Sequence, residues 1–505
     1  MTTLQGGTAY TKPTAMPAWF TTGNVVLATY LVILLTLAMY GFHRSMLVWL
    51  YYRTRGKDPA PESRFGDDAL PIVTIQLPLF NEMYVAPRLL DAVSKIDWPR
   101  DRLEIQVLDD STDETQEICK KKVDELRATG LDIQYIHRVD RTGFKAGALE
   151  NGLKTARGEF VMVFDADFLP PADIVERTIH YFTDPRVGMV QVRWEHVNRD
   201  YSKLTELQAM MLDGHFVIEH TARYRSGRFF NFNGTAGVWR RTTISDAGGW
   251  SHDTLTEDMD LSYRAQLRGW QFIYLRDTVS PAELPVEMNA FKSQQFRWAK
   301  GSIQVAKKLL PAILKNPKVP FGVKMEAFFH LTNNFAYPLL LLMSVLLLPN
   351  LLLRAKHGWT EVLLIDLPLF FGTTLSIASF YITCQREIQR DWRPTLRRLP
   401  LMMSLGIGLC VNQTRAVFEA LFGRTSGEFV RTPKHGVVRR FEGWTAKKYR
   451  GMKTIVPWVE VSFAAYFFVA AVLATLAGHY ISLPFLLLFM MGFGYVGVLS
   501  LRQTR

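Results

Sequence analysis

The stretch EFVMVFDAD, residues 159–167, joins a short apolar run to two carboxylates. Two similar runs, 72–76 and 104–108, lie upstream of it. Between about residues 68 and 285 such runs alternate with segments of helical periodicity, which indicates a parallel sheet covered by helices. Open α/β sheets bind ligands at the carboxyl ends of their strands. The pattern therefore predicts an α/β domain with an acidic ligand site at one edge of its sheet.

The composition adds membrane spans to this domain. The chain has 505 residues, of which 48% are hydrophobic, and a mean hydropathy of +0.03, which is too apolar for an ordinary soluble enzyme. Its net charge of +12 could suggest nucleic acid, but the Lys and Arg residues cluster beside the apolar stretches. Such clusters orient membrane helices, so we expect a lipid bilayer as a partner and no nucleic acid.

The cysteines give no sign of a disulfide framework or a metal knuckle. There are three, Cys119, Cys384 and Cys410, and their spacing contains no C-x-x-C pair. The α/β domain is therefore expected in a reducing cytosol.

The first long apolar run, 24–43, can cross a bilayer core of about 30 Å and is too long for a signal-peptide core. Basic residues follow this run, whereas the arm before it carries only Lys12. The positive-inside rule then places the N-terminus outside and the large middle region in the cytosol. Further spans are expected near 327–353, 363–384, 455–476 and 481–499.

These spans divide the chain into six expected segments. They are an extracytosolic arm (1–22), a first transmembrane helix (23–45), the cytosolic α/β domain with interfacial helices at its end (46–325), two transmembrane helices (326–384), a cytosolic interfacial helix and loop (385–453) and two final transmembrane helices (454–505).

Residues 398–421 are apolar at first but then carry Asn412, Gln413, Arg415 and Glu419. Polar and charged groups inside a membrane are costly unless they are buried or functional. Basic clusters flank this stretch on both sides, and both favour the cytosolic face. We therefore expect an interfacial or re-entrant helix here, because a sixth full span would leave a basic loop outside.

Asp165 and Asp167 stand one residue apart at the end of an expected strand. Isolated, a D-x-D pattern more often marks a solvated turn. After a buried strand, two carboxylates can face one divalent cation, and hard oxygen ligands suit Mn²⁺ or Mg²⁺. Such an ion would neutralise a nucleoside diphosphate as it leaves.

Two further features fit a nucleotide. Asp109 and Asp110 follow the preceding strand and can accept hydrogen bonds from a nucleobase or ribose, although neighbouring residues there can also cap a helix. Lys145 lies in a glycine-containing turn before a helix, where its cation can reach phosphate oxygens.

A candidate general base comes from the sequence Thr-Glu-Asp at 256–258. Asp258 is the favoured residue, with Glu257 and Asp260 as competitors on sequence alone, and an acidic helix start is the structural alternative. Downstream, the sequence QQFRW at 294–298 supplies Arg297 for a diphosphate and Trp298 for stacking on a sugar ring. Its aromatic residues could instead seat an amphipathic helix at the membrane surface.

From about residue 71 to residue 315 the chain resembles the family 2 glycosyltransferases of the GT-A fold. The likeness is to the processive, cellulose-synthase-like branch, and within it to mannan and glucomannan synthases. It rests on six motifs in this sequence: QVLDDSTD, GFKAGAL, FDADF, FNGTAGVWRR, AGGW and TEDMDL.

The resemblance implies specific roles for the residues in these motifs. Asp258 would be the catalytic base, and Asp165 and Asp167 would serve metal and diphosphate. The donor site would hold Asp109, Asp110, Lys145, Asp165, Gln294 and Arg297. The acceptor site would hold Asn233, Gly234, Thr235, Glu257 and Trp298.

A second likeness lies at residues 429–434, where FVRTPK is similar to the F-x-V-T-x-K gating loop of cellulose synthases. Phe429, Thr432 and Lys434 match that pattern, whereas Arg431 replaces its valine. A loop that closes over the nucleotide is expected, with a plain basic linker as the alternative.

The sequence thus predicts an α/β GT-A catalytic domain embedded in an α-helical transmembrane bundle. The expected activity is inverting, processive β-glycosyl transfer from a nucleotide sugar, GDP-mannose or UDP-glucose, with the growing polysaccharide exported through the spans. Alternatives are a UDP-glucose-dependent β-glucan synthase, a lipid glycosyltransferase of the ceramide glucosyltransferase type, and a non-catalytic scaffold. No cyclic-dinucleotide-binding domain is expected after the last span.

Overall fold

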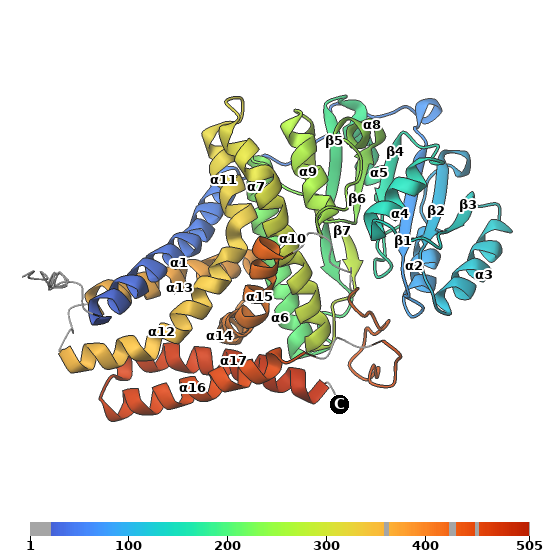
Figure 1. The fold of residues 1–505 in the computed structure, drawn as a ribbon. Coiled ribbons are helices and arrows are strands. Elements are labelled where there is room, and N and C mark those ends of the chain that lie inside the picture. Colours follow the sequence, from blue (N-terminus) through green and yellow to red (C-terminus); the bar gives the residue numbers. More distant parts are fainter. Residues whose placement is uncertain (1–21, 358–362, 424–430, 450–453, 504–505) are drawn as a thin grey trace, which may run out of the picture.

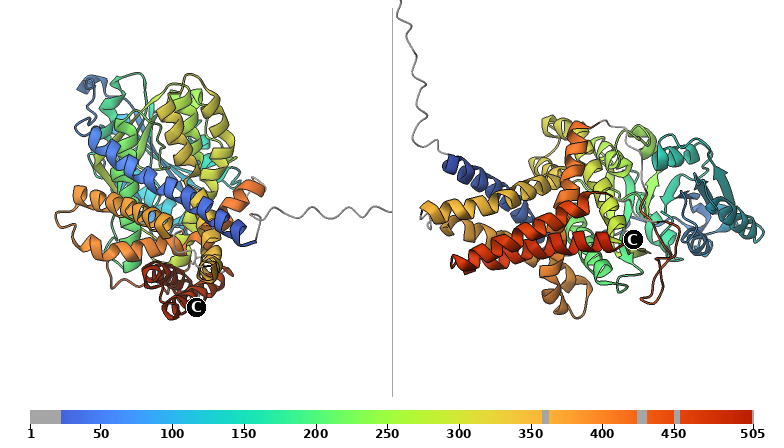
Figure 2. Two further views of the ribbon diagram at one scale, coloured as in Figure 1. Left: turned by 90° about the vertical axis from the view of Figure 1, so that its left-hand side faces the viewer. Right: turned by 60° about the horizontal axis from the view of Figure 1, so that its bottom comes forward.

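A computed structural model of the chain describes residues 22–357, 363–423, 431–449 and 454–503. Figure 1 shows a sheet with its short helices at one end of the molecule and long helices at the other. The same division is visible from below in Figure 2, where the long helices extend away from the sheet.

The described residues form a seven-stranded sheet in the order β3-β2-β1-β4-β6-β5-β7. The strands are β1 (Val73–Leu79), β2 (Leu103–Asp109), β3 (Ile133–His137), β4 (Phe160–Val163), β5 (Val187–His196), β6 (Gly237–Arg240) and β7 (Gln271–Ala282). The strands β1, β2 and β4 coincide with the apolar runs that the sequence marked as strands.

The sheet is mixed, so the expectation of a purely parallel sheet was wrong in one respect. β1 pairs in parallel with β2 and β4, but β6 runs antiparallel to both β4 and β5. After β5 the chain passes through a helical excursion and returns from the ligand-binding edge, which reverses the direction of β6. As a result β6 begins where β4 ends, and the N–H of Ala236 donates to the carbonyl of Val163 at 2.8 Å.

Helices cover both faces of the sheet and bury its apolar side chains. One core contains Leu89, Val123 and Ile174 from helices on one face, and a second contains Leu149 and Leu261 from helices on the other. The helices of this domain are α2 (Ala86–Val93), α3 (Thr115–Arg127), α4 (Phe144–Leu153), α5 (Ile174–Ile179), α6 (Lys203–Asp213), α7 (Thr221–Arg225), α8 (Arg241–Asp246) and α9 (Glu257–Leu267), with a π-helix (Gly214–His220) between α6 and α7.

Five helical segments in the described part of the chain are long and apolar enough to cross a membrane. They are Gly23–Arg53, Phe321–Leu353, Asp366–Ile388, Val456–Leu476 and Tyr480–Gln503. The helices concerned are α1 (Thr22–Arg53), α11 (Phe321–Thr332), α12 (Ala336–His357), α13 (Leu363–Ile388), α16 (Val456–Leu476) and α17 (Leu483–Gln503). By length and composition, the chain is a membrane protein.

The stretch expected as a single interfacial helix contains two short helices instead. α14 (Pro394–Gly408) and α15 (Cys410–Phe422) are separated at Leu409, and neither is long enough to span. Gly408 lies against α17, where a Cβ atom would sit 2.3 Å from the carbonyl oxygen of Gly492. The first helix therefore ends in a close backbone contact that only glycine permits.

The polar residues of this stretch hold α10 (Met288–Lys315). The Asn412 amide donates to the carbonyl of Lys292 at 2.9 Å, and the Gln413 amide donates to the carbonyl of Gln295 at 3.1 Å. Glu419 forms a 3.2 Å ion pair with Lys300. Asn412 and Gln413 are thus buried and satisfied by protein, which explains their presence in an apolar segment. Glu419 is partly exposed and also pairs with the exposed Arg415.

Substitution of Trp239 in β6 tests how much this core stabilises the domain. It is fully buried against Phe232, Trp250 and Phe272, with ring centroids 5.3–6.0 Å apart. Trp239→Ala should destabilise the domain by about 3–5 kcal/mol through lost burial and the cavity left behind. Thermal unfolding in detergent measures this loss of stability. The control is Phe441→Ala, because Phe441 is exposed. Equal unfolding temperatures for the two variants would contradict the expected destabilisation.

Candidate active site

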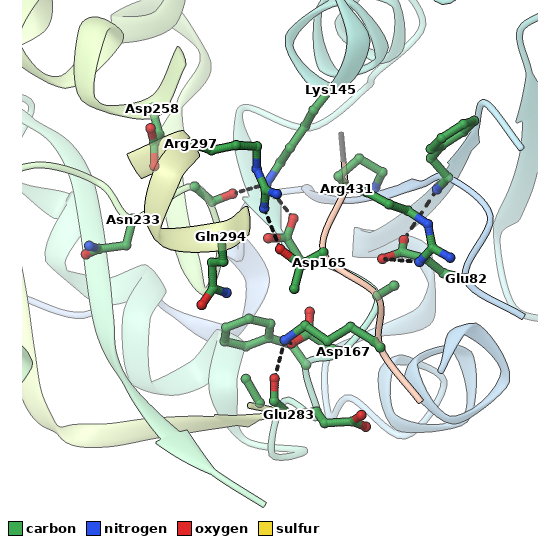
Figure 3. Close-up of a pocket in the computed structure, with 18 of the residues that line it drawn as sticks. Glu82, Lys145, Asp165, Asp167, Asn233, Asp258, Glu283, Gln294, Arg297 and Arg431 are labelled. Atoms are coloured by element: carbon green, nitrogen blue, oxygen red, sulfur yellow. Dashed lines mark hydrogen bonds and ion pairs between the residues drawn. The ribbon is translucent and has the colours of Figure 1, made fainter. Parts of the chain in front are cut away.

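A cavity opens at the sheet edge where β1, β4 and β7 end. In Figure 3, Lys145 and Arg297 point toward Asp165, and Arg431 lies beside Glu82. Asp258 and Asn233 lie on the other side of the cavity. The charged residues that line it are Glu82, Asp110, Asp165, Asp167, Glu257, Asp258 and Glu283 among the acids, and Arg141, Lys145, Arg297, Arg431 and Lys434 among the bases.

The two acids after β2 face different ways. Asp110 lines the cavity, and Arg138 donates to both of its carboxylate oxygens, at 2.8 and 2.5 Å. Asp109 is fully buried and does not line the cavity. Its carboxylate accepts from the Tyr135 hydroxyl at 2.7 Å and from the Ser111 N–H at 2.9 Å. Asp109 thus fixes the strand end, and Asp110 is the acid available to a ligand.

Lys145 connects two parts of the cavity wall. Gly143, with φ at 77°, begins helix α4, and Lys145 lies in its first turn. The ammonium contacts the Asp165 carboxylate and donates to the carbonyl of Gly234 at 2.9 Å. Burial works to lower the pKa of Lys145, but the nearby Asp165 and Glu257 carboxylates outweigh it and raise that pKa. The group is therefore a fixed cation within an acidic site.

Asp165 and Asp167 both line the cavity. The Asp165 N–H donates to the Thr235 hydroxyl at 2.9 Å, and Lys434 forms a 2.6 Å ion pair with Asp167. Burial raises the pKa of Asp165, and the Asp167 charge adds to this effect. In the described part of the chain, no cluster of three His, Cys, Asp or Glu side chains has metal-binding geometry. Two carboxylates completed by substrate phosphates are nevertheless a usual setting for Mg²⁺.

Asp258 lies at the start of α9, on the side of the cavity opposite Glu82 and Arg431 (Figure 3). One carboxylate oxygen accepts from the Met259 N–H at 2.8 Å. The other faces Gly234, where a Cβ atom would lie 3.0 Å away and φ is +80°, so glycine leaves the room beside it. Burial raises the pKa of Asp258 to about 8, and the neighbouring Glu257 charge adds to this. A carboxylate with such a pKa is well suited to general-base chemistry near neutral pH.

The other residues predicted for the acceptor fall into two groups. Asn233, Gly234, Glu257 and Trp298 line the cavity. Thr235 is fully buried behind it, where its hydroxyl holds the backbone of Asp165. It therefore shapes the site without facing the cavity.

Helix α10 brings Gln294, Arg297 and Trp298 to the cavity. The Arg297 guanidinium donates to the Thr432 hydroxyl at 2.7 Å. Burial lowers the pKa of Arg297 to about 10, against the opposing influence of Asp165 and Glu257. Arg297 therefore remains a cation at neutral pH and can bind an anion.

The described part of the segment predicted as a gating loop lies beside Arg297 and Asp167. Thr432 and Lys434 both line it, and the N–H groups of His435 and Gly436 donate to Glu283 at 2.9 and 3.1 Å. Phe429 lies outside the described residues.

Four charged residues of the cavity were missed in the sequence, namely Glu82, Arg141, Glu283 and Arg431. Glu82 follows β1 and Glu283 follows β7, so the rule that ligands bind at the carboxyl ends of strands could have found both. Arg431 was noted only as a departure from a motif. Its guanidinium lies 4.0 Å from the Glu82 carboxylate and 3.9 Å from the centroid of the Tyr449 ring.

This cavity continues toward the membrane helices. A second cavity shares Trp194, Asn233, Asp258 and Trp298 with the first. A third, bounded by apolar residues of α1, α12, α13, α14 and α17, shares a further set with the second: Tyr40, Arg44, Met211, Asn333, Tyr337 and Tyr381. The three cavities therefore follow one another from Asp165 to the apolar helices.

Comparison with known proteins places this geometry in a family. A family model described as "Glycosyltransferase like family 2" matches residues 71–301. Glucomannan 4-beta-mannosyltransferase 1 of Cyamopsis tetragonoloba is 33% identical over 447 residues, which cover 85% of this chain and 82% of that protein. The chain belongs to the family 2 glycosyltransferases. The mixed sheet and apolar helices of this glycosyltransferase confirm the predicted GT-A domain in a helical bundle.

Other relatives match a shorter part of the glycosyltransferase. Glucomannan 4-beta-mannosyltransferase 2 of Arabidopsis thaliana is 42% identical over 273 residues, or 53% of this chain and 51% of that protein. The chain thus spans about half the length of the first curated relatives it matches. Among solved structures, mannosyltransferase PcManGT from Pyrobaculum calidifontis in complex with GDP-Man and Mn²⁺ has 21% identity and a TM-score of 0.48, covering 72% of this chain and 100% of that one.

The raised pKa of Asp258 has a measurable effect on the stability of the glycosyltransferase. The folded protein holds this proton up to about pH 8, whereas the unfolded chain loses it near the ordinary value of 3.8. Unfolding therefore releases this proton at any pH between about 4 and 8, so the free energy of unfolding falls as pH rises through this range. Asp258→Asn, which stays neutral, should gain unfolding temperature over the wild type at pH 8 relative to pH 5. A gain that is the same at both values would show that Asp258 is not held protonated.

Proposed function

We propose that the protein is an inverting, processive β-mannosyltransferase that builds a mannan or glucomannan chain from GDP-mannose and exports it. The observation that carries this proposal is the order of the cavities, from a site lined by acidic and basic side chains, past Asp258, to the apolar helices. The relatives named above are glucomannan mannosyltransferases, which favours mannose as the sugar.

In this mechanism Asp258 accepts the proton of the acceptor hydroxyl. The hydroxyl oxygen then bonds to the anomeric carbon of the donor as the bond from that carbon to the diphosphate oxygen breaks. Attack from the face opposite the leaving group inverts the configuration, so an α-linked donor gives a β-linked product. Trp298 lies beside Asp258 on the shared wall of the two cavities, where its ring can stack on the terminal sugar.

The nucleotide end of the cavity supplies the groups that a diphosphate needs. Arg297 and Lys145 provide positive charge, Gln294 provides an amide, and Asp110 provides an acceptor for nucleoside hydroxyls. Asp165 and Asp167 would hold Mn²⁺ or Mg²⁺, and such an ion, when bound, supplies further charge neutralisation for the leaving diphosphate. Each of these carboxylates contacts a lysine, Lys145 for Asp165 and Lys434 for Asp167, so a bound ion would compete with these ammonium groups for the carboxylates.

Residues 431–436 serve as a gate over the donor. The Thr432 hydroxyl accepts a hydrogen bond from Arg297, and Lys434 pairs with Asp167, so the segment contacts two of the groups assigned to the diphosphate. Closure of this kind excludes water and limits hydrolysis of the donor.

The growing polymer would leave through the second and third cavities. Aromatic residues line that path, among them Trp298, Tyr337, Tyr381 and Phe489. With the basic clusters on the cytosolic side, the catalytic domain is cytosolic and the product crosses a plasma, inner or Golgi membrane. A UDP-glucose-dependent glucan synthase would use the same mechanism, and a lipid glycosyltransferase would stop after one transfer.

The test is an assay of detergent-purified protein with Mn²⁺ or Mg²⁺ and each common nucleotide sugar. GDP-mannose should release GDP and give an insoluble product that mannanase digests. Asp258→Asn should lower that rate by about 10²–10⁴-fold, the usual contribution of a general base, and chelation of the metal should stop it.

Each other outcome of this assay has a definite meaning. Turnover of UDP-glucose with a glucanase-sensitive polymer would replace the sugar and keep the mechanism. A single lipid-linked sugar would replace processive synthesis, and no turnover with any donor would contradict the enzyme assignment.

A further inference from the structure

A line of three polar side chains, Glu219, His215 and Asn233, runs from the membrane side of the second cavity to its catalytic side. The π-helix Gly214–His220 places His215 and Glu219 on the cavity wall. His215 Nδ1 lies 3.1 Å from Glu219 Oε2, and His215 Nε2 lies 3.0 Å from the amide nitrogen of Asn233. Asn233 directly precedes Gly234, the residue beside Asp258.

Glu219 is held as a carboxylate at one end of this line. Arg44 of α1 approaches it at 3.2 Å and Arg223 of α7 at 3.4 Å. Burial alone would raise the pKa of Glu219, but Arg223, the hydrogen bond from His215 and Arg44 together hold it well below its usual range. An ionised carboxylate can only accept hydrogen bonds.

The orientation of the other two groups follows from this charge. Because Glu219 accepts, His215 Nδ1 carries the proton. In a neutral imidazole Nε2 is then an acceptor, which is satisfied by an N–H of the Asn233 amide. The amide nitrogen of Asn233 therefore faces His215, and its carbonyl oxygen, Oδ1, is turned the other way.

Asn233 Oδ1 is buried and has no hydrogen-bond partner among the described residues. The backbone of Asn233 is fixed, because its N–H donates to Gln191 Oε1 at 3.0 Å. A buried amide oxygen without a partner costs roughly 1–3 kcal/mol. A ligand hydroxyl in the cavity would remove that cost. Asn233 lines both the first and the second cavity.

We propose that His215 and Glu219 are positioning residues that hold Asn233 with its oxygen toward the acceptor sugar. That oxygen accepts a hydrogen bond from a ring hydroxyl next to the one that Asp258 deprotonates. The two contacts together orient the attacking oxygen toward the donor. This inference rests on the proposed function, because it assigns the acceptor subsite of the same reaction.

The arrangement predicts that loss of the Asn233 contact slows chain elongation more than it slows hydrolysis of the donor. Transfer to water releases GDP without needing the Asn233 contact, whereas chain elongation needs it. The informative quantity is therefore the amount of mannose found in polymer per GDP released. A substitution that merely weakens the fold lowers both reactions and leaves this ratio unchanged.

The variants are His215→Leu, which removes the acceptor nitrogen, and His215→Gln, which retains an amide oxygen for Asn233. His215→Leu should lower the ratio at least tenfold, and His215→Gln should restore most of it. Glu219→Gln should lower it at least threefold, because a neutral amide no longer dictates which imidazole nitrogen is protonated. The matched control is Glu176→Gln, since Glu176 pairs with His180 at the same four-residue spacing, at 3.2 Å and outside the three cavities.

A binding titration with β-1,4-linked mannohexaose keeps the inference independent of turnover. The wild type should bind this probe at least threefold more tightly than His215→Leu. Unchanged ratios together with equal binding would overturn the proposal, as would a loss in Glu176→Gln equal to that in Glu219→Gln. A wild type that turns over no nucleotide sugar would contradict the proposed function instead, and the titration would still decide the role of His215.

Discussion

The contact on which the site depends is that of the Lys145 ammonium with Asp165 and with the carbonyl of Gly234. It joins the end of β4 to the turn before β6, and so joins the side of the cavity that carries Asp165 to the side that carries Asp258. Without a cation there, the half-buried carboxylates of Asp165, Glu257 and Asp258 would repel one another more strongly than in water. Burial, with a smaller contribution from the Glu257 charge, still raises the pKa of Asp258, which the proposed mechanism uses.

The long apolar helices also hold residues of the cavity in place. Helix α10 carries Gln294, Arg297 and Trp298, and it is held by polar contacts from α15 and by a 2.7 Å ion pair between Lys292 and Glu460 of α16. Arg44 of α1 reaches the catalytic domain through Glu219. The residues that line the cavity are thus fixed by the long apolar helices as well as by the sheet. In the proposed function, this arrangement would couple sugar transfer to export.

The sequence predicted those features that depend on local pattern. Strands followed by acids, as at Asp165, and the long apolar helices are set by short-range preferences and hydropathy, so they could be identified directly. The direction of β6 could not, because it depends on the path that the chain takes after β5. Asp109 and Thr235 were expected in the cavity because they adjoin residues that line it. Tertiary packing buries both, so they fix the neighbouring backbone without facing the cavity. The line from Glu219 to Asn233 was invisible because its members are brought together by a π-helix and a turn.

The central claim is that one path carries the product from Asp258 to the far side of the membrane. Its most direct test uses protein reconstituted in sealed vesicles with the catalytic domain outward, supplied with GDP-mannose and then with mannanase outside. If the polymer is exported along this path, it should resist mannanase until the vesicles are opened with detergent. A polymer that is digested completely in intact vesicles would contradict export through the three cavities.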